Sequence, residues 1–589
     1  MALLAMFTVF YPLQSHDYWD AWINSHSYSH GLLLLLVSLF LIGSKPHAVT
    51  GSQGNIVFLL LLAGLMGLLV AWLGWSALAA IAAGSNGLAM TMLPNALRET
   101  GVLMLSVGLL TGCAGLVAAW LVTHYEFPLR RLFDWALVLP LAVPTYLAAY
   151  CYVEFLGFPG PVQTALRMVN GAATLQDYWF PDIRSTGGAV LVLSSVLYPY
   201  VYVACRGFFL MQSASLNIAA RTLGAGGMRT FFTVTLPLSR PALVVGVTLA
   251  MMEVVNDLGA VQYFGINAIT AIIYSTWINR SDFGGAAQLA VTVVLVIGLL
   301  IAAEQRARRD RVYLSHRDSR IPPAREYLVG ARRWLAFGLC LSLLVLGFGI
   351  PVGQLSYLAL RALRADSLSM TINALVPTLI LASLGAIITV IIGLVAAKLG
   401  HRTGNVGRGA IRLATLGYAI PGTVLALGLL QPLGQADLWF NRLTMALAGW
   451  RPGLILSGSM AALLYVYAIR FLAVSHATLD AGIKKRGEAM LDAGRVLGER
   501  GLGLLLRIDL PTLMPAILSA GTLVFVEIIK ELPATLLLRP LGVETLATLV
   551  YARANVGLFA QAALPALFIV LAGLIPVVLA TRWGDRRKV

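Results

Sequence analysis

The stretch Ile218-Ala-Ala-Arg-Thr-Leu-Gly224, followed after nine residues by Val234-Thr-Leu-Pro237, lies between two hydrophobic runs and has a second copy. The copy reads Asp492-Ala-Gly-Arg-Val-Leu-Gly498 and, again after nine residues, Ile508-Asp-Leu-Pro511. The two glycines are 274 residues apart, and so are the two prolines. Gly permits a sharp turn, and Pro can begin the next helix at its first turn. We interpret each copy as a segment that is recognised from outside the membrane.

The repeat extends beyond this stretch. Glu253 and Glu527 are also 274 residues apart, as are Asp257 and Glu531. A whole half of the chain is therefore duplicated.

The composition is that of a polytopic membrane protein. Of 589 residues, 59% are hydrophobic and 12% are charged, and the apolar residues occur in runs of about twenty, the length that crosses a bilayer core. Six spans precede a polar linker and six follow it, so the two repeats have the same orientation. Within the third and ninth spans, Pro144 and Pro421 each free a backbone carbonyl and can kink the helix. The predicted spans lie near residues 56–82, 101–123, 133–156, 188–210, 242–262, 286–303, 334–355, 373–398, 411–433, 454–474, 512–531 and 562–581.

We predict an all-α polytopic membrane protein made of two parallel six-helix repeats. The weak apolar run 31–43 is short for a span, so an extra N-terminal membrane helix stays an open alternative. The predicted parts of the chain are an N-terminal extension (1–50), a first half (51–303, with its loop at 218–237), a basic cytoplasmic linker (304–333) and a second half (334–589, with its loop at 492–511).

The repeated pattern resembles the cytoplasmic EAA loop of the permease subunits of binding-protein-dependent ABC importers. In that loop Glu-Ala-Ala, three residues and Gly are followed, after nine residues, by Ile-x-Leu-Pro. The first copy departs from the pattern at Ile218, and the second departs at Asp492 and Gly494. The resemblance implies a fold of the ABC importer permease type and a short helix-turn-helix that docks on a separate ATPase, with two ATPase copies expected. It also implies that ATP and Mg²⁺ are held by that ATPase and that this chain binds no cofactor. The residues it assigns to the coupling loops are Ala219, Ala220, Gly224, Leu236, Pro237, Asp492, Ala493, Gly498, Leu510 and Pro511.

The distribution of Lys and Arg explains most of the net charge of +16. If both loops face the cytoplasm, 31 basic residues lie on that side and 10 on the other, with Lys530 inside a span. This bias agrees with the positive-inside rule, and it requires no nucleic acid as a partner. The nine arginines of 302–333 are expected to fix the topology and to touch anionic membrane lipid. The expected location is the bacterial inner membrane, with several passes.

Motifs for catalysis are absent from the sequence. There is no Gly-Lys dipeptide, so the chain has no phosphate-binding loop, and there is no His-Glu-x-x-His, Cys-x-x-Cys or Gly-x-Ser-x-Gly. The four cysteines fall within apolar spans and indicate no disulfide framework. We predict a transport subunit that is not an enzyme and takes its energy from a partner.

Acidic residues occur in pairs, at i and i+4, within the fifth and eleventh spans. Glu253 lies roughly 18 Å into its span, near the midplane. An ionised group there costs about 3 kcal/mol or more unless it faces water, a partner or a substrate. Lys530 can neutralise one acid, so an internal ion-pair network is an equally good interpretation for any single residue. The duplication places the set symmetrically, and we predict that it lines a translocation pathway formed by Glu253, Asp257, Glu527 and Glu531.

The segments that contain these acids, together with Glu544-Thr-Leu-Ala and Tyr551, resemble the ferric-iron branch of these permeases, in which both halves are often fused. The resemblance covers about residues 56–580. It implies import of ferric iron that a periplasmic binding protein delivers. Carboxylates suit a hard cation, but they also attract a thiamine cation. Permeases for thiamine, phosphonates or polyamines therefore remain alternatives, and the metal ligands are unknown.

Two other classes compete with this interpretation. A proton-driven secondary transporter of the 6+6 parallel kind fits the acids, but the paired loops argue against it. A membrane-embedded peptidase lacks any nucleophile and base. The N-terminal extension also gathers histidines and acids that could hand a metal ion inward, although polar residues that flank a membrane helix are the plainer interpretation. These residues are His16, Asp17, Asp20, His26 and His30.

Overall fold

A computed structural model of the chain describes most of it from residue 87 onward. The described residues are 59, 63–64, 66, 70–74, 76–78, 87–171, 174, 176–211, 224, 226–309, 325–362, 365–400, 404–487, 489–499 and 501–585. The histidine-containing extension 1–50 and the middle of the basic linker lie outside them.

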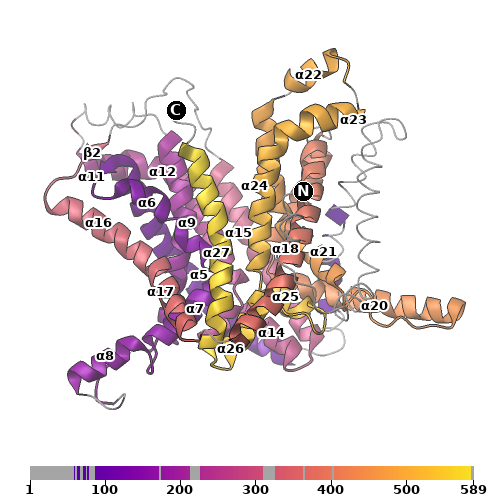
Figure 1. Cartoon of the computed structure of the whole chain (residues 1–589), viewed down its shortest axis with the longest axis horizontal. Coiled ribbons are helices and arrows are strands. Elements are labelled where there is room, and N and C mark those ends of the chain that lie inside the picture. The colour runs from indigo at the N-terminus through magenta and orange to yellow at the C-terminus, as the bar shows by residue number, and fades with distance from the viewer. Residues whose placement is uncertain are drawn as a thin grey trace.

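The first half consists of long helices that cross the molecule and short helices at its two ends (Figure 1). Its elements are α5 (Gly87–His124), α6 (Arg130–Ala136), η1 (Leu139–Ala142), α7 (Thr145–Leu156), α8 (Pro161–Asn170), α9 (Thr186–Met211), α11 (Gly227–Thr230), η2 (Phe231–Thr235), α12 (Leu236–Asn256), α13 (Gly259–Tyr263), α14 (Ile269–Ile278) and α15 (Phe283–Arg309).

The second half repeats this order after a helix that is broken by a π-helical turn. Its elements are α16 (Ala331–Leu344), η3 (Val345–Gly349), α17 (Ile350–Arg361), α18 (Ala365–Gly400), α19 (Gly404–Ala414), η4 (Thr415–Tyr418), α20 (Gly422–Ala448), α21 (Met460–Arg486), α22 (Ala489–Val496), α23 (Gly501–Leu504), η5 (Leu505–Asp509), α24 (Leu510–Ile529), α25 (Pro533–Leu538), α26 (Leu546–Asn555) and α27 (Phe559–Asp585).

The repeat holds in fine detail. The π-helical turns η2 and η5 begin 274 residues apart, and α12 and α24 begin at the same distance directly after them. A π-helical turn is rare and is often found at functional sites. Both turns lie where a predicted coupling loop joins the following membrane helix.

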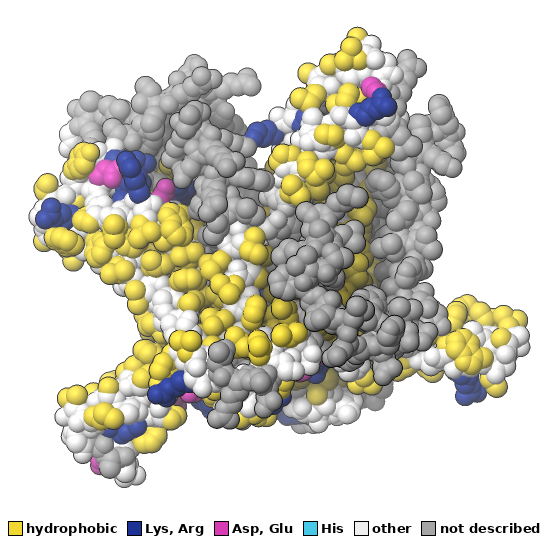
Figure 2. Space-filling view, in the orientation of Figure 1, with side chains coloured by type: hydrophobic (Ala, Val, Ile, Leu, Met, Phe, Trp, Pro, Cys, Tyr) yellow, Lys and Arg dark blue, Asp and Glu magenta, His cyan; other side chains and the backbone are white. Residues whose placement is uncertain are grey.

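The predicted class, an all-α polytopic membrane protein, is confirmed. Among the described residues, eight helices are long and apolar enough to cross a membrane, and ten spans result if each of two bent helix pairs counts as one. These ten correspond to ten of the predicted spans. The first predicted span, 56–82, lies mostly outside the described residues, and Phe559–Ile575 of α27 counts as a shorter apolar helix. Figure 2 shows hydrophobic side chains over the middle of the molecule and basic side chains toward its ends, as a bilayer requires.

The third and ninth spans are broken more sharply than a kink. The pair Arg130–Ala142 and Thr145–Asn170 bends by 92°, and the pair Gly404–Tyr418 and Gly422–Ala448 bends by 105°. Pro144 and Pro421 stand at the breaks as the N-caps of α7 and α20. A proline cannot donate a backbone hydrogen bond, so the helix ends before it and a new one starts.

The first span of each half packs on the other half. Leu59 and Ala63 are buried against Ala396 of α18. In the opposite direction, the hydroxyl of Tyr152 in α7 donates a hydrogen bond of 2.6 Å to the carbonyl of Leu346 in η3. The two predicted halves are therefore interleaved rather than separate bodies.

The end of the linker is fixed to the first half. Strands β1 (Tyr125–Glu126) and β2 (Glu326–Tyr327) pair in parallel. The Glu126 carboxylate accepts bonds from Arg130 at 3.0 Å and from Arg325 at 3.3 Å. This carboxylate ties the linker to the turn that follows α5.

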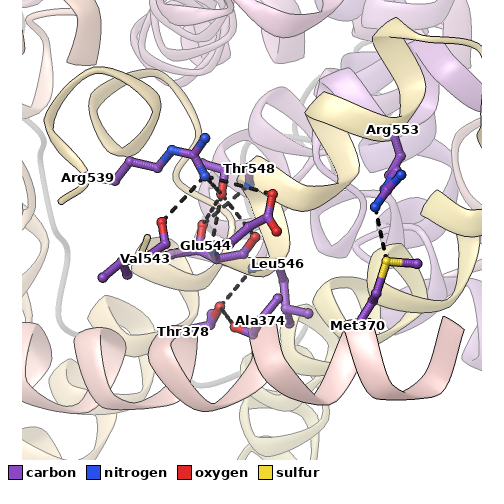
Figure 3. A network of polar contacts seen from close by, with 10 residues as sticks. Met370, Ala374, Thr378, Arg539, Val543, Glu544, Leu546, Thr548 and Arg553 are labelled. Carbon is purple, nitrogen blue, oxygen red and sulfur yellow. Dashed lines mark hydrogen bonds and ion pairs between the residues drawn. The ribbon is translucent and has the colours of Figure 1, made fainter. Parts of the chain in front are cut away.

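The end of the molecule opposite the coupling loops has matching clamps in both halves, and Figure 3 shows the clamp of the second half. In the second half, the Leu546 amide donates to Thr378 Oγ1 at 2.8 Å, and Arg553 Nη2 lies 3.0 Å from Met370 Sδ. In the first half, the Ile269 amide donates to Thr100 Oγ1 at 2.9 Å, and Arg280 Nη1 lies 3.4 Å from Met92 Sδ. Each clamp fixes the short outer helix, α14 or α26, on a long one.

Candidate functional site

A cavity of about 90 Å³ lies between the two halves, at the C-terminal ends of α12 and α24. Both halves contribute to its wall, from α7, α9 and α12 on one side and from η4, α21 and α24 on the other. All four acids predicted for the pathway line it. Its charged and polar lining includes Tyr200, Glu253, Asn256, Asp257, Tyr418, Arg470, Glu527, Lys530 and Glu531.

Glu253 connects the halves through tyrosine. Its Oε1 accepts a hydrogen bond from Tyr418 at 3.2 Å and another from Tyr200 at 3.4 Å. Tyr418 belongs to the second half and Tyr200 to the first. The carboxylate therefore holds a contact that must change if the two halves move apart.

The acids of the second half are each paired with a base. Lys530 Nζ lies 2.8 Å from Glu527 Oε1, and Arg470 Nε lies 3.3 Å from Glu531 Oε2. Arg470 also donates to the carbonyl of Ile420 at 3.3 Å. The guanidinium and the Glu531 carboxylate are both buried.

Two of the acids also shape the backbone. Asp257 Oδ1 accepts from the Ala260 amide at 2.9 Å, and Glu531 Oε1 accepts from the Ala534 amide at 3.0 Å. These amides lie in the first turns of α13 and α25, where helices leave N–H groups without partners. The break after α12 and α24 is thus stabilised by the same carboxylates that line the cavity. Asp257 and Glu531 can therefore line a pathway and, at the same time, stabilise the break in the backbone.

Some cavity residues were not predicted as site residues. Arg470 stands near the end of the predicted span 454–474 and was not assigned to the pathway, but it lies in the cavity wall. A lone arginine inside the apolar run of α21 is the signal that could have found it, since charged residues within spans are costly and functional. Tyr418 stands in the repeated proline segment, whereas Tyr200 has no comparable sequence signal.

The second coupling loop forms the expected helix and turn. Asp492 and Ala493 lie in α22, and Gly498 follows it with a positive φ of 90°. Val496 and Leu497 are 86% and 82% exposed. Two large apolar side chains exposed at the end of α22, among charged residues, suit a contact with another protein.

The first coupling loop is described only in part. Gly224 has a positive φ of 83°, matching Gly498, and Leu236 and Pro237 begin α12 as Leu510 and Pro511 begin α24. Ala219 and Ala220 lie outside the described residues. Figure 1 shows α11 and α22 at the same end of the molecule, so the described parts of both loops face the same side.

Ion pairs between side chains hold the second loop where it joins α24. Asp509 ends η5, and its carboxylate pairs with Arg486 of α21 and, at 2.5 Å, with Lys398 of α18. Thr235 is the residue of the first half at the matching position, and it is buried. The first loop is held instead by aromatic packing, with Trp120 and Phe231 ring centres 4.6 Å apart.

No group of three or more His, Cys, Asp or Glu side chains within the described ranges is arranged to hold a metal ion. The cavity acids therefore do not form a closed chelate in this conformation.

Comparisons with known proteins agree with this architecture. Residues 111–309 match the family described as binding-protein-dependent transport system inner membrane component. The chain is 24% identical over 499 residues to the Fe(3+)-transport system permease protein FbpB 2 of Haemophilus influenzae, covering 83% of this chain and 90% of the relative. It is 32% identical over 204 residues to the molybdenum transport system permease protein ModB of Escherichia coli, covering 33% of this chain and 86% of the relative. It is 35% identical over 148 residues to the sulfate transport system permease protein CysW of Escherichia coli, covering 25% of this chain and 48% of the relative.

The fold and the paired loops define a membrane permease of an importer. This chain belongs to the family of binding-protein-dependent transport system inner membrane components, with both permease halves in one polypeptide. It is a transport subunit of the inner membrane that crosses the bilayer several times.

Proposed function

We propose that this chain is the permease through which an ATP-driven importer moves ferric iron into the cytoplasm. The observation that carries the proposal is the cavity between the halves, in which four carboxylates face two bases. Carboxylate and phenol oxygens suit a hard cation such as Fe³⁺. A relative that matches over both halves is an Fe(3+) permease by name, which supports the same substrate.

An oxyanion is the competing substrate, because the molybdenum and sulfate permeases match over shorter regions. Lys530 and Arg470 are the groups that would receive it. Each already has its own carboxylate, at 2.8 Å and 3.3 Å. An oxyanion would have to displace an acid that stays in the cavity, so the site's charge favours a cation.

The size of the cavity bears on the organic alternatives. Pockets for organic ligands occupy about 300 Å³ or more, whereas this cavity has about 90 Å³. A metal ion with a few waters needs far less rearrangement here than thiamine or a polyamine does.

Transport in this proposal alternates between two packings of the halves. Tyr418 and Glu253 join the halves in the cavity, and Tyr551 donates to Gln262 at 2.7 Å nearer the outer end. Opening to either side must break one of these contacts. A separate ATPase, expected in two copies and carrying ATP and Mg²⁺, would act on the coupling loops, and a periplasmic binding protein would act on the outer face.

Uptake by proteoliposomes tests the proposal. The purified chain is reconstituted with its ATPase, and binding protein loaded with radioactive iron is supplied outside. Uptake should need ATP and should not follow an imposed proton gradient; iron uptake that follows the proton gradient and ignores ATP would establish a secondary transporter instead. Molybdate or sulfate uptake without iron uptake would establish the oxyanion alternative.

A variant with all four cavity acids neutralised tests the route itself. It combines Glu253→Gln, Asp257→Asn, Glu527→Gln and Glu531→Gln, which keep volume and remove charge. Iron uptake should be lost while the protein still assembles with its ATPase. Normal iron uptake by this variant would rule out these acids as the pathway.

A further inference from the structure

The two walls of the cavity differ in charge, and the difference follows the repeat. In the second half, Lys530 occupies the position that Asn256 has in the first, and Arg470 occupies the position of Val196. The acids of the second half therefore have bases beside them. At the matching positions of the first half stand an amide and an apolar residue.

The first-half wall also presents oxygens without partners. Asn256 Oδ1 and Asp257 Oδ2 have no hydrogen-bond partner within bonding distance among the described residues, although the two residues are only 5% and 7% exposed and both line the cavity. The Asp257 carboxylate also interacts with the side chain of Thr145. Burying an acceptor without a partner is costly, and the cost is larger for a charged group. Such atoms are found where water or a ligand completes the bonding.

We infer that the first-half wall carries a single cation-accepting subsite, formed by Glu253, Asn256 and Asp257. The inference rests on the proposed function, since it names the part of the cavity that receives the ion. The subsite would take a hard cation that retains several waters, because the oxygens come from one wall and do not enclose an ion. Lys530 and Arg470 keep the opposite wall neutral, so an ion is not drawn equally to both walls.

The neighbourhood of the break explains why the walls can differ. The residue after the helix-breaking proline is Thr145 in the first half and Gly422 in the second. A β-carbon on Gly422 would lie 2.6 Å from Glu531 Oε1 and 2.9 Å from Arg470 Nη1. Gly422 thus makes room for the buried arginine, and the first half, with Thr145 and Val196, has no such pair.

Terbium luminescence tests the subsite. Tb³⁺ is a hard trivalent ion whose emission is sensitised by nearby aromatic rings, and Tyr200 and Tyr418 line the same cavity. The full chain in lipid nanodiscs is titrated with Tb³⁺. Because Asp257→Asn removes one of the two negative charges of the subsite, it should weaken the tyrosine-sensitised binding about tenfold or more. Asn in this position can still accept the bond from the Ala260 amide, so the backbone break is preserved.

Two matched variants of the second half sharpen the test. The double variant Glu527→Gln with Lys530→Gln removes one acid and one base and should leave Tb³⁺ affinity within about twofold, since no net charge changes. Lys530→Asn copies the first half onto the second and should tighten binding several-fold. If Asp257→Asn fails to fold, Asn256→Leu removes the other unpartnered oxygen and should also weaken binding.

The outcomes separate the two proposals. Unchanged Tb³⁺ affinity in folded Asp257→Asn and in Asn256→Leu would overturn the subsite, even if the wild-type chain imports iron. Equal weakening by the Glu527 and Lys530 double variant would also overturn it, because the site would then not belong to one wall. Absence of iron uptake by the wild type would instead overturn the proposed function, and the first-wall dependence of Tb³⁺ binding would still be measured.

Discussion

The two halves share a backbone but differ in the chemistry that holds it. Both coupling loops have a left-handed glycine, at φ 83° and 90°, and both continue through a π-helical turn into a membrane helix. Yet Asp509 of the second half is held by Lys398 and Arg486, while the first half uses aromatic packing around Trp120.

The same contrast appears in the cavity, where the bases are confined to the second half. Backbone geometry is thus what the duplication preserves, and charge is what has diverged between the copies. Substitutions at matched positions should therefore give equal effects when they act on the backbone of the loops and unequal effects when they act on charge.

The largest effect is expected where the halves agree. Gly498→Trp and Gly224→Trp should each abolish ATP-driven uptake. A left-handed conformation costs a residue with a β-carbon roughly 1–2 kcal/mol. No atom of the described residues lies within 4 Å of a β-carbon at either site, so the indole would extend into the docking surface. Uptake by proteoliposomes and the amount of folded protein in the membrane are measured together.

Gly498→Asn is the matched control for the loop, because Asn tolerates the left-handed region. It should retain most of the uptake. Wild-type uptake by either Trp variant would show that its loop does not dock on the ATPase.

The next effect should separate the halves. Asp509→Asn removes the shared partner of two cations, and breaking a buried pair in this way costs about 3–5 kcal/mol, reduced to about 2–3 kcal/mol by the partial exposure of Lys398. Thr235→Ala at the matching position should cost about 1 kcal/mol. Thermal unfolding in detergent measures both losses of stability. Equal losses would contradict the view that ion pairs hold the second loop and aromatic packing holds the first.

Much of the fold is readable from the sequence because the repeat is carried by local signals. The 274-residue period, the runs of apolar residues and the Leu-Pro steps all depend on the chain itself. The packing of the first span of each half on the opposite half has no such local signal in the sequence. Leu59 meets Ala396, and Tyr152 bonds the carbonyl of Leu346, through contacts between residues far apart in the chain.

The same limit applies to the candidate site. The i, i+4 spacing put Glu253 and Asp257 on one helix face, but the helix ends at Asn256 and Asp257 caps the next one. Spacing assumes a continuous helix, and the break depends on the fit of α13. Arg470 was left out of the predicted pathway for a related reason, since the distribution of basic residues along the chain cannot show that a guanidinium turns inward toward Glu531.

A smaller effect is expected at the residue after each helix-breaking proline. Gly422→Thr would place a β-carbon against Glu531, Arg470 and the Ala534 amide, at 2.6, 2.9 and 3.1 Å. Overpacking of this kind costs about 1–3 kcal/mol. The reverse change, Thr145→Gly, removes atoms from a wall that holds no arginine, together with the interaction between Thr145 and Asp257, and should cost about 1 kcal/mol. Thermal unfolding measures the loss of stability in the two variants. A smaller loss for Gly422→Thr than for Thr145→Gly would show that the ion pair of Arg470 and Glu531 does not require a glycine at position 422.

The smallest effect is expected at the surface of the second loop, where the halves differ at the first position of the motif. Asp492 lies 2.5 Å from Arg495, but the two side chains are 61% and 48% exposed. Exposed pairs contribute about 0.2–1 kcal/mol, so Asp492→Ala should leave the stability of the folded protein within about 1 kcal/mol of wild type. Any fall in ATP-driven uptake, expected at about twofold to fivefold from one exposed contact, would then report docking on the ATPase rather than unfolding of α22.

Arg495→Ala breaks the same pair and keeps the acid, so it should affect uptake less. Ile218→Ala makes the corresponding change in the first loop and should reduce uptake less than Asp492→Ala. An equal fall in all three variants would show that the acid of the second loop has no special part in coupling.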